Sequence, residues 1–402
     1  MPDESSKKIP VLALTSVYPR FDEDTEVPWL RISMRELAAR GCDVTIAAPS
    51  YKGLKSHRID GVPVYRYRYA PAKLEFLTHE EGAPSKIARN PLLQLLAIPY
   101  LISGSLKALF LCLKLKPAII HVHWPFPHAF MALFARFFCR RAKIVLTFYS
   151  AELLLAKKKK WIRPILKSFI KRADSVIAIS AFAKNTVTNI RNREIEILPY
   201  GTTLRNASGA KAARPPADKF RILFVGRHIE RKGIEYLIKA AAALDPNIYQ
   251  VRIVGQGDLT EKLKTQAAEE APEQVVFLGK ISNKELEKEY QTAGCFILPA
   301  IIDSRGDTEG LGVVMIEAAE YGVPVIASDV GGIVDVIIDG KTGLLVKEKS
   351  PQELTGAIRR LHDDPVLSKT LADNCLAHVN EFFSWDRITE KQVAIYKKVI
   401  GN

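Results

Sequence analysis

The sequence predicts an α/β protein made of two Rossmann-like domains of similar size. Short runs rich in β-branched residues alternate with helical patterns along the whole chain, which is typical of βαβ units and parallel sheets. The length of 402 residues suits two domains, at roughly 100–200 residues per domain. A hydrophobic content of 48% with 25% charged residues provides for two buried cores and excludes a disordered chain.

Twelve short runs are expected to form strands, six in each half of the chain. In the first half they are residues 11–17, 44–48, 119–123, 144–147, 175–179 and 195–198. In the second half they are residues 221–225, 251–254, 275–278, 295–298, 323–327 and 343–346. Helices are expected at 28–40, 233–243 and 312–321, the last followed by Gly322, a residue type common just past a helix end. We therefore predict two six-stranded sheets.

The predicted domain boundary is the segment 201–219, GTTLRNASGAKAARPPADK. It is rich in Gly, Ala and Pro and has no apolar periodicity, as expected of a linker between domains 1–200 and 220–383. In open α/β sheets, ligands bind beyond the carboxyl ends of the strands. We therefore expect the ligand in a cleft between the two domains.

The cysteines and the first residues favour a reduced, cytoplasmic chain. The five cysteines are scattered and form no CxxC pair, which argues against a disulfide scaffold or a zinc site. The start, MPDESSKKIP, lacks the basic and apolar regions of a signal peptide. The longest uncharged run, residues 91–106, is 16 residues long, short of the ~18–20 that a membrane span needs. We expect it to be a buried or interfacial helix.

The net charge of +14 resides in the first half of the chain. Residues 1–200 carry 32 Lys and Arg against 16 Asp and Glu, whereas residues 201–402 carry 26 against 28. The positive charge is concentrated in the segment 156–172, AKKKKWIRPILKSFIKR, which has eight cations and apolar residues at largely helical spacing. One interpretation is an anionic membrane surface site in 157–172. The other is an apolar face packed on its own domain with solvated lysines, and both can hold together. Nucleic acid is not expected, because no binding motif accompanies the charge.

An acidic and glycine-rich segment, 307–343, is the most specific part of the sequence. Glu309 and Glu317 flank Gly310 and Gly312 at an expected helix start. Exposed N–H groups at a helix start favour phosphate oxygens, and carboxylates accept hydrogen bonds from vicinal hydroxyls. The alternative is that Glu309 caps the helix and Glu317 is a solvated side chain.

Two further turns end strands of the same half. In 221–238, RILFVGRHIERKGIEYLI, Gly226 precedes Arg227 and Lys232, two cations suited to a pyrophosphate. In 251–258, VRIVGQGD, Gly255 and Gly257 let backbone pass close to a ligand. Three such turns in order along one domain indicate a phosphate-containing ligand.

Together these motifs, GRxxxxKG, VGQG, EGLGxxxxEA, GVPVIAS, GG and DGKTGLLV, resemble the donor domain of the family 4 retaining glycosyltransferases of GT-B fold. The resemblance extends to ADSVIAISAFAKN at 173–185 and ILPYG at 197–201. It also includes FSWDRITEKQVAIY at 383–396, so it implies that a C-terminal helix, 384–402, packs back onto the first domain. It implies a nucleotide-sugar donor as substrate, with no cofactor and no metal.

The resemblance also implies the roles of the donor-site residues. The expected binding residues are Gly226, Arg227, Lys232, Gly255, Gly257, Glu309, Gly310, Leu311, Gly312 and Glu317. Arg227 and Lys232 would hold the donor diphosphate. Glu309 and the backbone after it would hold the transferred sugar, and Glu317 the nucleoside ribose.

A histidine pair marks the first domain. His121 and His123 project to one face of a strand, with His123 at its carboxyl end. They could be metal ligands together with His128, or satisfied core histidines, which fits His121 better. In the resembled family a histidine at this strand end reaches the donor sugar and diphosphate. That role is assigned to His123, with His121 as the fallback.

The first domain departs from the family in two places. The loop 16–27, SVYPRFDEDTEV, has four acids and no glycine, and LTFYSAELL at 146–154 lacks the family's histidine. Tyr149, Ser150 and Glu152 are candidates to line an acceptor pocket, although Glu152 equally fits a helix-start acid. The acceptor therefore stays open.

We predict a retaining, metal-independent glycosyltransferase that moves a sugar from a UDP- or GDP-sugar to a saccharide or lipid-linked acceptor, in the synthesis of cell-envelope glycolipid or polysaccharide. The expected catalytic residues are Glu309, His123, Arg227 and Lys232. The alternatives are a nucleotide-sugar epimerase of the same fold and a non-catalytic anion- or membrane-binding module. The expected location is the cytoplasm, with peripheral association to the inner face of the cell membrane.

Overall fold

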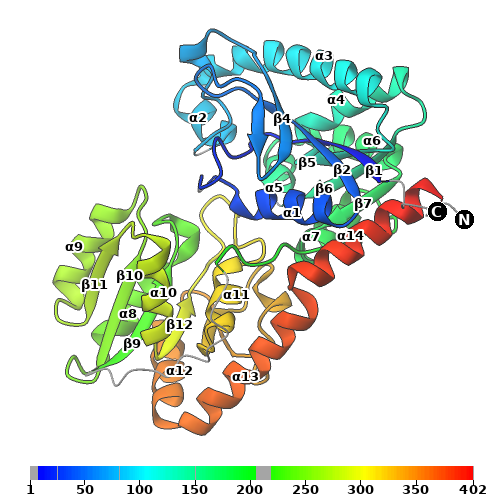
Figure 1. Ribbon diagram of the computed structural model, residues 1–402. Coiled ribbons are helices and arrows are strands. Elements are labelled where there is room, and N and C mark those ends of the chain that lie inside the picture. Colours follow the sequence, from blue (N-terminus) through cyan, green and yellow to red (C-terminus); the bar gives the residue numbers. More distant parts are fainter. Residues whose placement is uncertain (1–7, 25, 81, 150, 205–218, 402) are drawn as a thin grey trace, which may run out of the picture. The chain divides into compact units, whose positions relative to one another are not determined.

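The computed structural model describes residues 8–401 apart from 25, 81, 150 and 205–218. The chain divides into two compact units (Figure 1). The first contains Met1–Tyr200 and Trp385–Asn402, and the second contains Gly201–Ser384. Residues 201–204 of the predicted linker thus belong to the second unit, and most of the rest lies outside the described residues.

The first unit contains an eight-stranded sheet in the order β3-β4-β2-β1-β5-β6-β7-β8. The strands are β1 (Ile9–Leu14), β2 (Cys42–Pro49), β3 (His57–Ile59), β4 (Val62–Tyr67), β5 (Ile119–His123), β6 (Lys143–Phe148), β7 (Ser175–Ala178) and β8 (Glu196–Ile197). All neighbouring pairs are parallel except β3 with β4.

The prediction of six strands for this sheet was wrong, because it missed the β3–β4 hairpin. The hairpin turns at Asp60 and Gly61, both with positive φ, 47° and 77°. An Asp-Gly pair at a two-residue turn is a strong hairpin signal, since both positions require left-handed backbone. The signal was present in the sequence, but β3 is only three residues long and shows no alternation of its own.

Eight helices are described in the first unit. They are α1 (Pro28–Ala39), α2 (Ala83–Arg89), α3 (Ala97–Leu115), α4 (Pro125–Phe138), α5 (Ala151–Lys158), α6 (Ile162–Arg172), α7 (Ala181–Ile190) and α14 (Trp385–Ile400). Helix α14 packs on α1 and buries Trp385 and Tyr396 in the same core as β1 and β2. The first unit is therefore closed by a helix that follows the second unit in sequence.

Helices α3 and α4 lie side by side in the first unit (Figure 1). Gly104 of α3 faces Met131 of α4, and a Cβ at Gly104 would come within 2.5 Å of the Met131 methyl group. The short helix η2 (Pro91–Leu96) continues into α3, so Pro91–Leu115 forms one helical stretch of 25 residues. By length and composition alone, this stretch could cross a membrane. It is longer than the uncharged run predicted from sequence because it also contains Lys107 and Lys114.

The second unit contains a six-stranded parallel sheet in the order β11-β10-β9-β12-β13-β14. The strands are β9 (Phe220–Val225), β10 (Tyr249–Val254), β11 (Val275–Gly279), β12 (Cys295–Leu298), β13 (Val325–Ser328) and β14 (Leu344–Val346). All six predicted strands of this half are present, with ends shifted by at most two residues.

The helices of the second unit are α8 (Ile234–Ala242), α9 (Thr260–Glu270), α10 (Asn283–Thr292), α11 (Val313–Glu320), α12 (Pro351–Asp363) and α13 (Pro365–Phe382), with short η3 (Glu230–Lys232) and η4 (Ile333–Asp335). Strand β9 is central, and the chain continues to β10 on one side while β12 pairs on the other. The sheet order therefore reverses beside β9, which is where open α/β sheets bind ligands at the strand ends.

Candidate active site

The turns after β9 and β10 are joined backbone to backbone. The Gly226 N–H donates to Val254 O at 3.0 Å, and the His228 N–H donates to Gln256 O at 3.2 Å. A Cβ at Gly255 would lie 1.9 Å from Gly226 O, and one at Gly257 would lie 2.5 Å from His228 O. Contact between the two loops therefore requires both glycines. Their expected part in binding a ligand stays a prediction.

A buried ion pair joins the turn after β9 to the loop after β12. Lys232 Nζ lies 2.5 Å from Glu309 Oε2, and both residues are only 8% exposed. Lys232 reaches this position because Gly233 has φ +63° and lies so close to Pro299 that a Cβ would be 1.9 Å from its carbonyl oxygen. Two of the predicted donor-site residues, 77 positions apart in sequence, are thus in direct contact.

The surroundings keep the Glu309 carboxyl of this pair ionised. Burial would raise the pKa of Glu309, but the positive charges of Lys232 and Arg231 outweigh it and lower the pKa to about 2. Burial lowers the pKa of Lys232, and the neighbouring carboxylate of Glu309 opposes that effect. Glu309 is therefore a carboxylate at neutral pH, and the ion pair uses only one of the three N–H donors of Lys232.

Arg231 is a site residue that the sequence interpretation missed. Its guanidinium lies 3.4 Å from Glu309 Oε2 and 3.7 Å from Asp307 Oδ2, and it donates to Thr308 O at 3.2 Å. It anchors the loop that carries Glu309. The signal available in the sequence was its position next to Lys232.

Arg227 is exposed at the end of β9. Its charge contributes to lowering the pKa of both Lys232 and Glu309, which places it in the same electrostatic cluster. The cluster contains three cations, Arg227, Arg231 and Lys232, and two carboxylates, those of Asp307 and Glu309. An excess of positive charge at a helix-bearing strand end favours an anion such as a diphosphate.

Glu309 does not cap helix α11, so that alternative is wrong. The N-cap residue is Gly312, with φ +84° and no side-chain cap. Instead, the loop of Glu309 is held by the glycine pair at 331–332. The Gly332 N–H donates to Glu309 O at 2.9 Å, and a Cβ at Gly331 or Gly332 would lie about 2 Å from the carbonyl oxygen of Glu309 or Gly310. This second glycine pair fixes the backbone at Gly310 and Leu311.

Glu317 is not a solvated side chain either, since it is 4% exposed. Its Oε1 accepts a hydrogen bond from the Thr203 hydroxyl at 2.9 Å and its Oε2 from the Tyr290 hydroxyl at 3.1 Å. Burial raises its pKa, and these two hydrogen bonds oppose the increase. Both carboxylate oxygens of Glu317 therefore accept hydrogen bonds from hydroxyl groups of the protein.

In the first unit, the two histidines of β5 have different surroundings. His121 lies between the Tyr396 hydroxyl, 2.6 Å from Nδ1, and the Thr147 hydroxyl, 2.7 Å from Nε2. It is the satisfied core histidine. His123 Nδ1 is 2.6 Å from the Tyr149 hydroxyl, whereas its buried Nε2 has no partner among the described residues. Burial lowers the pKa of His123 well below its usual value, so the ring is neutral.

A cluster of aromatic side chains adjoins His123 through Tyr149, and the sequence interpretation identified only Tyr149 among its members. Trp124 stacks on Tyr149 with ring centroids 4.5 Å apart, and Trp29 stacks on Tyr200 at 4.6 Å. Trp124 follows β5 directly in left-handed backbone, with φ 55°. Strained backbone of this kind is frequent at binding sites.

Glu152 is a buried helix-start acid of α5. Its Oε1 accepts a hydrogen bond from the Tyr149 N–H at 2.9 Å, whereas its Oε2 has no partner among the described side chains and backbone. Burial raises its pKa to about 7. The third candidate for an acceptor pocket, Ser150, lies outside the described residues.

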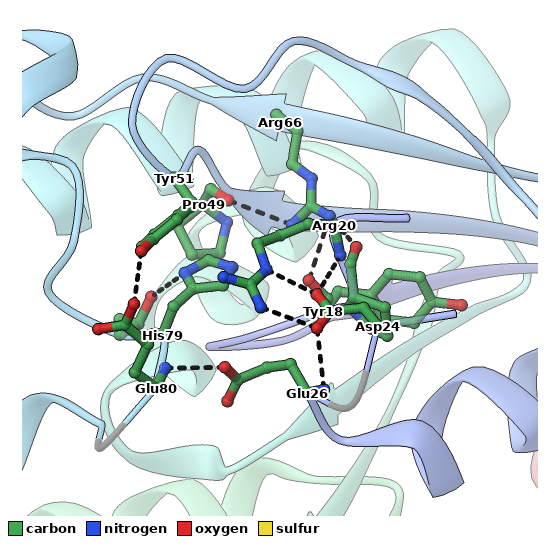
Figure 2. A network of polar contacts seen from close by, with 11 residues as sticks. Tyr18, Arg20, Asp24, Glu26, Pro49, Tyr51, Arg66, His79 and Glu80 are labelled. Atoms are coloured by element: carbon green, nitrogen blue, oxygen red, sulfur yellow. Dashed lines mark hydrogen bonds and ion pairs between the residues drawn. The ribbon is translucent and has the colours of Figure 1, made fainter. Parts of the chain in front are cut away.

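The glycine-free loop after β1 is held by charged groups (Figure 2). Arg20 and Asp24 form a bidentate ion pair at 2.7 and 2.8 Å, and the Arg20 N–H also donates to the same carboxylate. The buried guanidinium of Arg66 donates to the carbonyl oxygens of Tyr18 and Pro19 on this loop and to Pro49 O at the end of β2. Side-chain hydrogen bonds thus fix this loop, where the family often has glycines.

The basic segment 157–172 has its apolar face inside the unit. Ile162, Leu166, Phe169 and Ile170 are buried in the core, while Lys157–Lys160 and Trp161 are exposed. The structure therefore shows apolar packing on the domain for α6, and attachment of the exposed lysines to a membrane stays a prediction. Across the described residues, no three His, Cys, Asp or Glu side chains come together as metal ligands would.

The fold and these strand-end residues place the chain in the class of the glycosyltransferases, and comparison with known proteins agrees. Two family models match the chain: Glycosyltransferase Family 4 over residues 33–205 and Glycosyl transferases group 1 over residues 210–375. The chain belongs to the group 1 glycosyltransferases of GT-B fold. The glycosyltransferase activity predicted from sequence is thereby confirmed at this level.

The chain is similar to proteins of several bacteria. It is 26% identical over 404 residues to TuaC of Bacillus subtilis, named for teichuronic acid biosynthesis, covering 93% of this chain and 94% of the relative. Among solved structures, sucrose-phosphate synthase from Thermosynechococcus elongatus gives a TM-score of 0.76 at 22% identity, covering 98% and 100% of the two chains. HepE from Anabaena, in complex with UDP and glucose, gives 0.70 at 18% identity, covering 96% and 98%.

Proposed function

We propose that this glycosyltransferase is a retaining, metal-independent enzyme that transfers a sugar from a UDP- or GDP-sugar to a saccharide or lipid-linked acceptor. The observation that carries the proposal is the cluster of Arg227, Arg231, Lys232 and Glu309 at the ends of β9 and β12. A cationic cluster with an ionised carboxylate matches a donor that has a diphosphate beside a polyhydroxyl sugar. The similarity to HepE, which was solved with UDP and glucose, supports a nucleotide-sugar donor.

In this proposal, Lys232 and Arg227 stabilise the departing diphosphate, with backbone N–H groups at the start of α11. Preorganised charges of this kind supply several kcal/mol in a site that excludes water. Glu309, already ionised and held by two cations, positions the sugar hydroxyls. Glu317 exchanges its hydrogen bonds with Thr203 and Tyr290 for the ribose hydroxyls.

The acceptor is activated without a protein nucleophile. The leaving phosphate accepts the proton of the acceptor hydroxyl on the same face of the sugar, so the configuration of the anomeric carbon is retained. His123 keeps its assigned catalytic role in this proposal, supported by a neutral imidazole whose buried Nε2 has no partner among the described residues. Trapping of a covalent glycosyl–Glu309 adduct would contradict this role of Glu309.

The biological setting is part of the same proposal. The similarity to TuaC supports cell-envelope polysaccharide or glycolipid synthesis. The positive charge of the first half of the chain supports a cytoplasmic enzyme that associates with the inner face of the cell membrane.

The test is a screen of UDP- and GDP-sugars, first alone and then with lipid-linked acceptors. We expect slow donor hydrolysis with one donor and faster transfer with an acceptor, in the presence of EDTA, and a product whose anomeric configuration by NMR is that of the donor. Conversion of the donor to its epimer without an acceptor would identify the enzyme as an epimerase instead. Calorimetry that detects neither UDP nor GDP binding would refute the proposed donor class.

A further inference from the structure

The outer surface of α3 and α4 in the first unit is apolar and exposed. Of the 21 large apolar side chains that are exposed among the described residues, eleven lie between positions 92 and 138. These eleven define the α3–α4 face: Leu92, Leu95, Ile98, Ile102, Leu106, Phe110, Leu113, Phe130, Phe134, Phe137 and Phe138. The function proposed above uses none of them.

Along α3, the exposed apolar residues follow one another at intervals of three or four positions, which places them in one stripe. The opposite side of the helix, with Tyr100, Ala108 and Leu111, is already buried in the core of the unit. Packing within the unit therefore explains one side of α3 only. A second apolar side on a helix that stays at the surface indicates a binding surface.

Positive charge surrounds this face. Residues 82–174 contain 17 Lys and Arg but two acids, buried Glu152 and Asp174, which pairs with Arg136 and Lys143. Lys107 and Lys114 lie over the Phe110 ring, with Nζ 5.6 and 5.9 Å from its centroid. The exposed lysines 157–160 precede Trp161, whose ring contacts Phe126 of α4 at 6.0 Å. Cationic heads on apolar stems therefore border the apolar side chains.

The combination of exposed apolar side chains and positive charge indicates what kind of partner binds this face. A second copy of the chain would bring two positive surfaces together, and their repulsion opposes such a dimer. A protein partner would need polar groups to fix its register, yet all eleven side chains are hydrocarbon. An anionic bilayer requires no register, and it offers acyl chains to the stripe and phosphates to the lysines.

We propose that the α3–α4 face docks the first unit on an anionic membrane surface, with its apolar side chains inserted at the boundary between headgroups and acyl chains. Helix α3 lies on the membrane and does not cross it, because crossing would pull Tyr100 and Leu111 out of the core. The inference places the apolar contact on α3 and α4, while the lysines at 157–160 add electrostatic attraction. It concerns attachment, so it stands or falls independently of the transfer reaction.

The experiment is co-sedimentation of the full chain with phosphatidylcholine vesicles, with and without phosphatidylglycerol. The test variant replaces Ile102, Leu106 and Phe137 by Gln. The matched control makes three equivalent substitutions in the second unit, at Ile248, Val366 and Phe382, which are also exposed and apolar. Circular dichroism and thermal unfolding establish that both triple variants fold, which exposed positions should allow.

We expect the wild-type chain and the control to bind anionic vesicles, and the test variant to bind at least ten-fold more weakly. Binding should decrease with added salt and on neutral vesicles. The proposal is overturned if the wild-type chain does not bind anionic vesicles, or if the test variant binds like the control. It is also overturned if the wild-type chain dimerises through this face, so that the test variant is monomeric where the control is not.

Discussion

Glu309→Gln tests whether the charge cluster of the second unit is as strongly coupled as the structure indicates. The pKa of Glu309 is about 2, against an ordinary value of 4.5. A depressed carboxyl pKa stabilises the folded state above the ordinary pKa, and this stabilisation is lost as the pH falls toward the folded-state pKa. At 1.36 kcal/mol per pKa unit, the full contribution is about 3 kcal/mol at neutral pH.

Between pH 3 and pH 6, about 2 kcal/mol of this contribution should appear. We therefore expect the stability difference between wild type and Glu309→Gln to grow by about 2 kcal/mol over this pH range. The control is Glu261→Gln, since Glu261 is a surface carboxylate that pairs with exposed Lys264. Such surface pairs contribute little.

The assay must report on the second unit alone. All four tryptophans of the chain lie in the first unit, so their fluorescence does not report unfolding of the second unit. Hydrogen exchange of peptides from β9 and β12, followed by mass spectrometry, measures the opening free energy of the second unit directly. Parallel pH profiles for wild type and Glu309→Gln would refute the coupling between Glu309 and its two cations.

Four other substitutions have defined outcomes. Lys232→Ala should lower kcat/KM by ~30-fold or more, about 2 kcal/mol of transition-state stabilisation. The control Lys239→Ala, at an exposed position of α8, should leave kcat/KM unchanged, and equal kcat/KM values for the two variants would exclude a role of Lys232 at the diphosphate. The Glu152→Gln variant should gain roughly 3 kcal/mol of stability relative to wild type as the pH rises from about 4 to 8, because a buried carboxyl with its pKa raised to about 7 costs stability once it ionises. Urea unfolding followed by tryptophan fluorescence measures this gain, and a stability difference that is constant with pH would contradict the prediction. Arg66→Lys should destabilise the first unit by roughly 2 kcal/mol in the same assay, because one ammonium group cannot reach the carbonyl oxygens of both strand ends; unchanged stability would mean that the loop is held without Arg66. Gly255→Ala should destabilise the second unit by ~2 kcal/mol or more in hydrogen exchange, since φ is +122° and the new Cβ would collide with Gly226 O; wild-type protection would show that the two loops can separate at no cost.

The sheets could be predicted from sequence because buried parallel strands are continuous apolar runs bounded by turns. Strand β12 is an example, with its predicted and observed ends identical. The contact between Lys232 and Glu309 could not be predicted from spacing, because it depends on how two loops 77 residues apart meet beside the central strand. Arg231 was missed for the same reason.

The exposed apolar side of α3 could not be predicted from the sequence pattern either, for a different reason. Amphipathic periodicity reveals a surface helix when its outer side is polar. In α3 both the buried Leu111 and the exposed Phe110 are apolar, so the pattern has no contrast. The α6 segment shows the opposite case: its strong periodicity correctly marks an apolar side, and burial of Leu166 and Ile170 shows that the side faces inward.

Helix α14 gives the two units an unequal order of completion during synthesis. The second unit is contiguous, so it has all of its residues once position 384 has left the ribosome. The first unit must wait for Tyr396, whose hydroxyl satisfies His121 in the middle of its sheet. The first unit is therefore synthesised first but completed last. Until α14 has been made, the His121 imidazole lacks the Tyr396 hydroxyl, and the core surface that α14 covers is exposed to chaperones. A truncation that removes Tyr396 should accordingly destabilise the N-terminal unit.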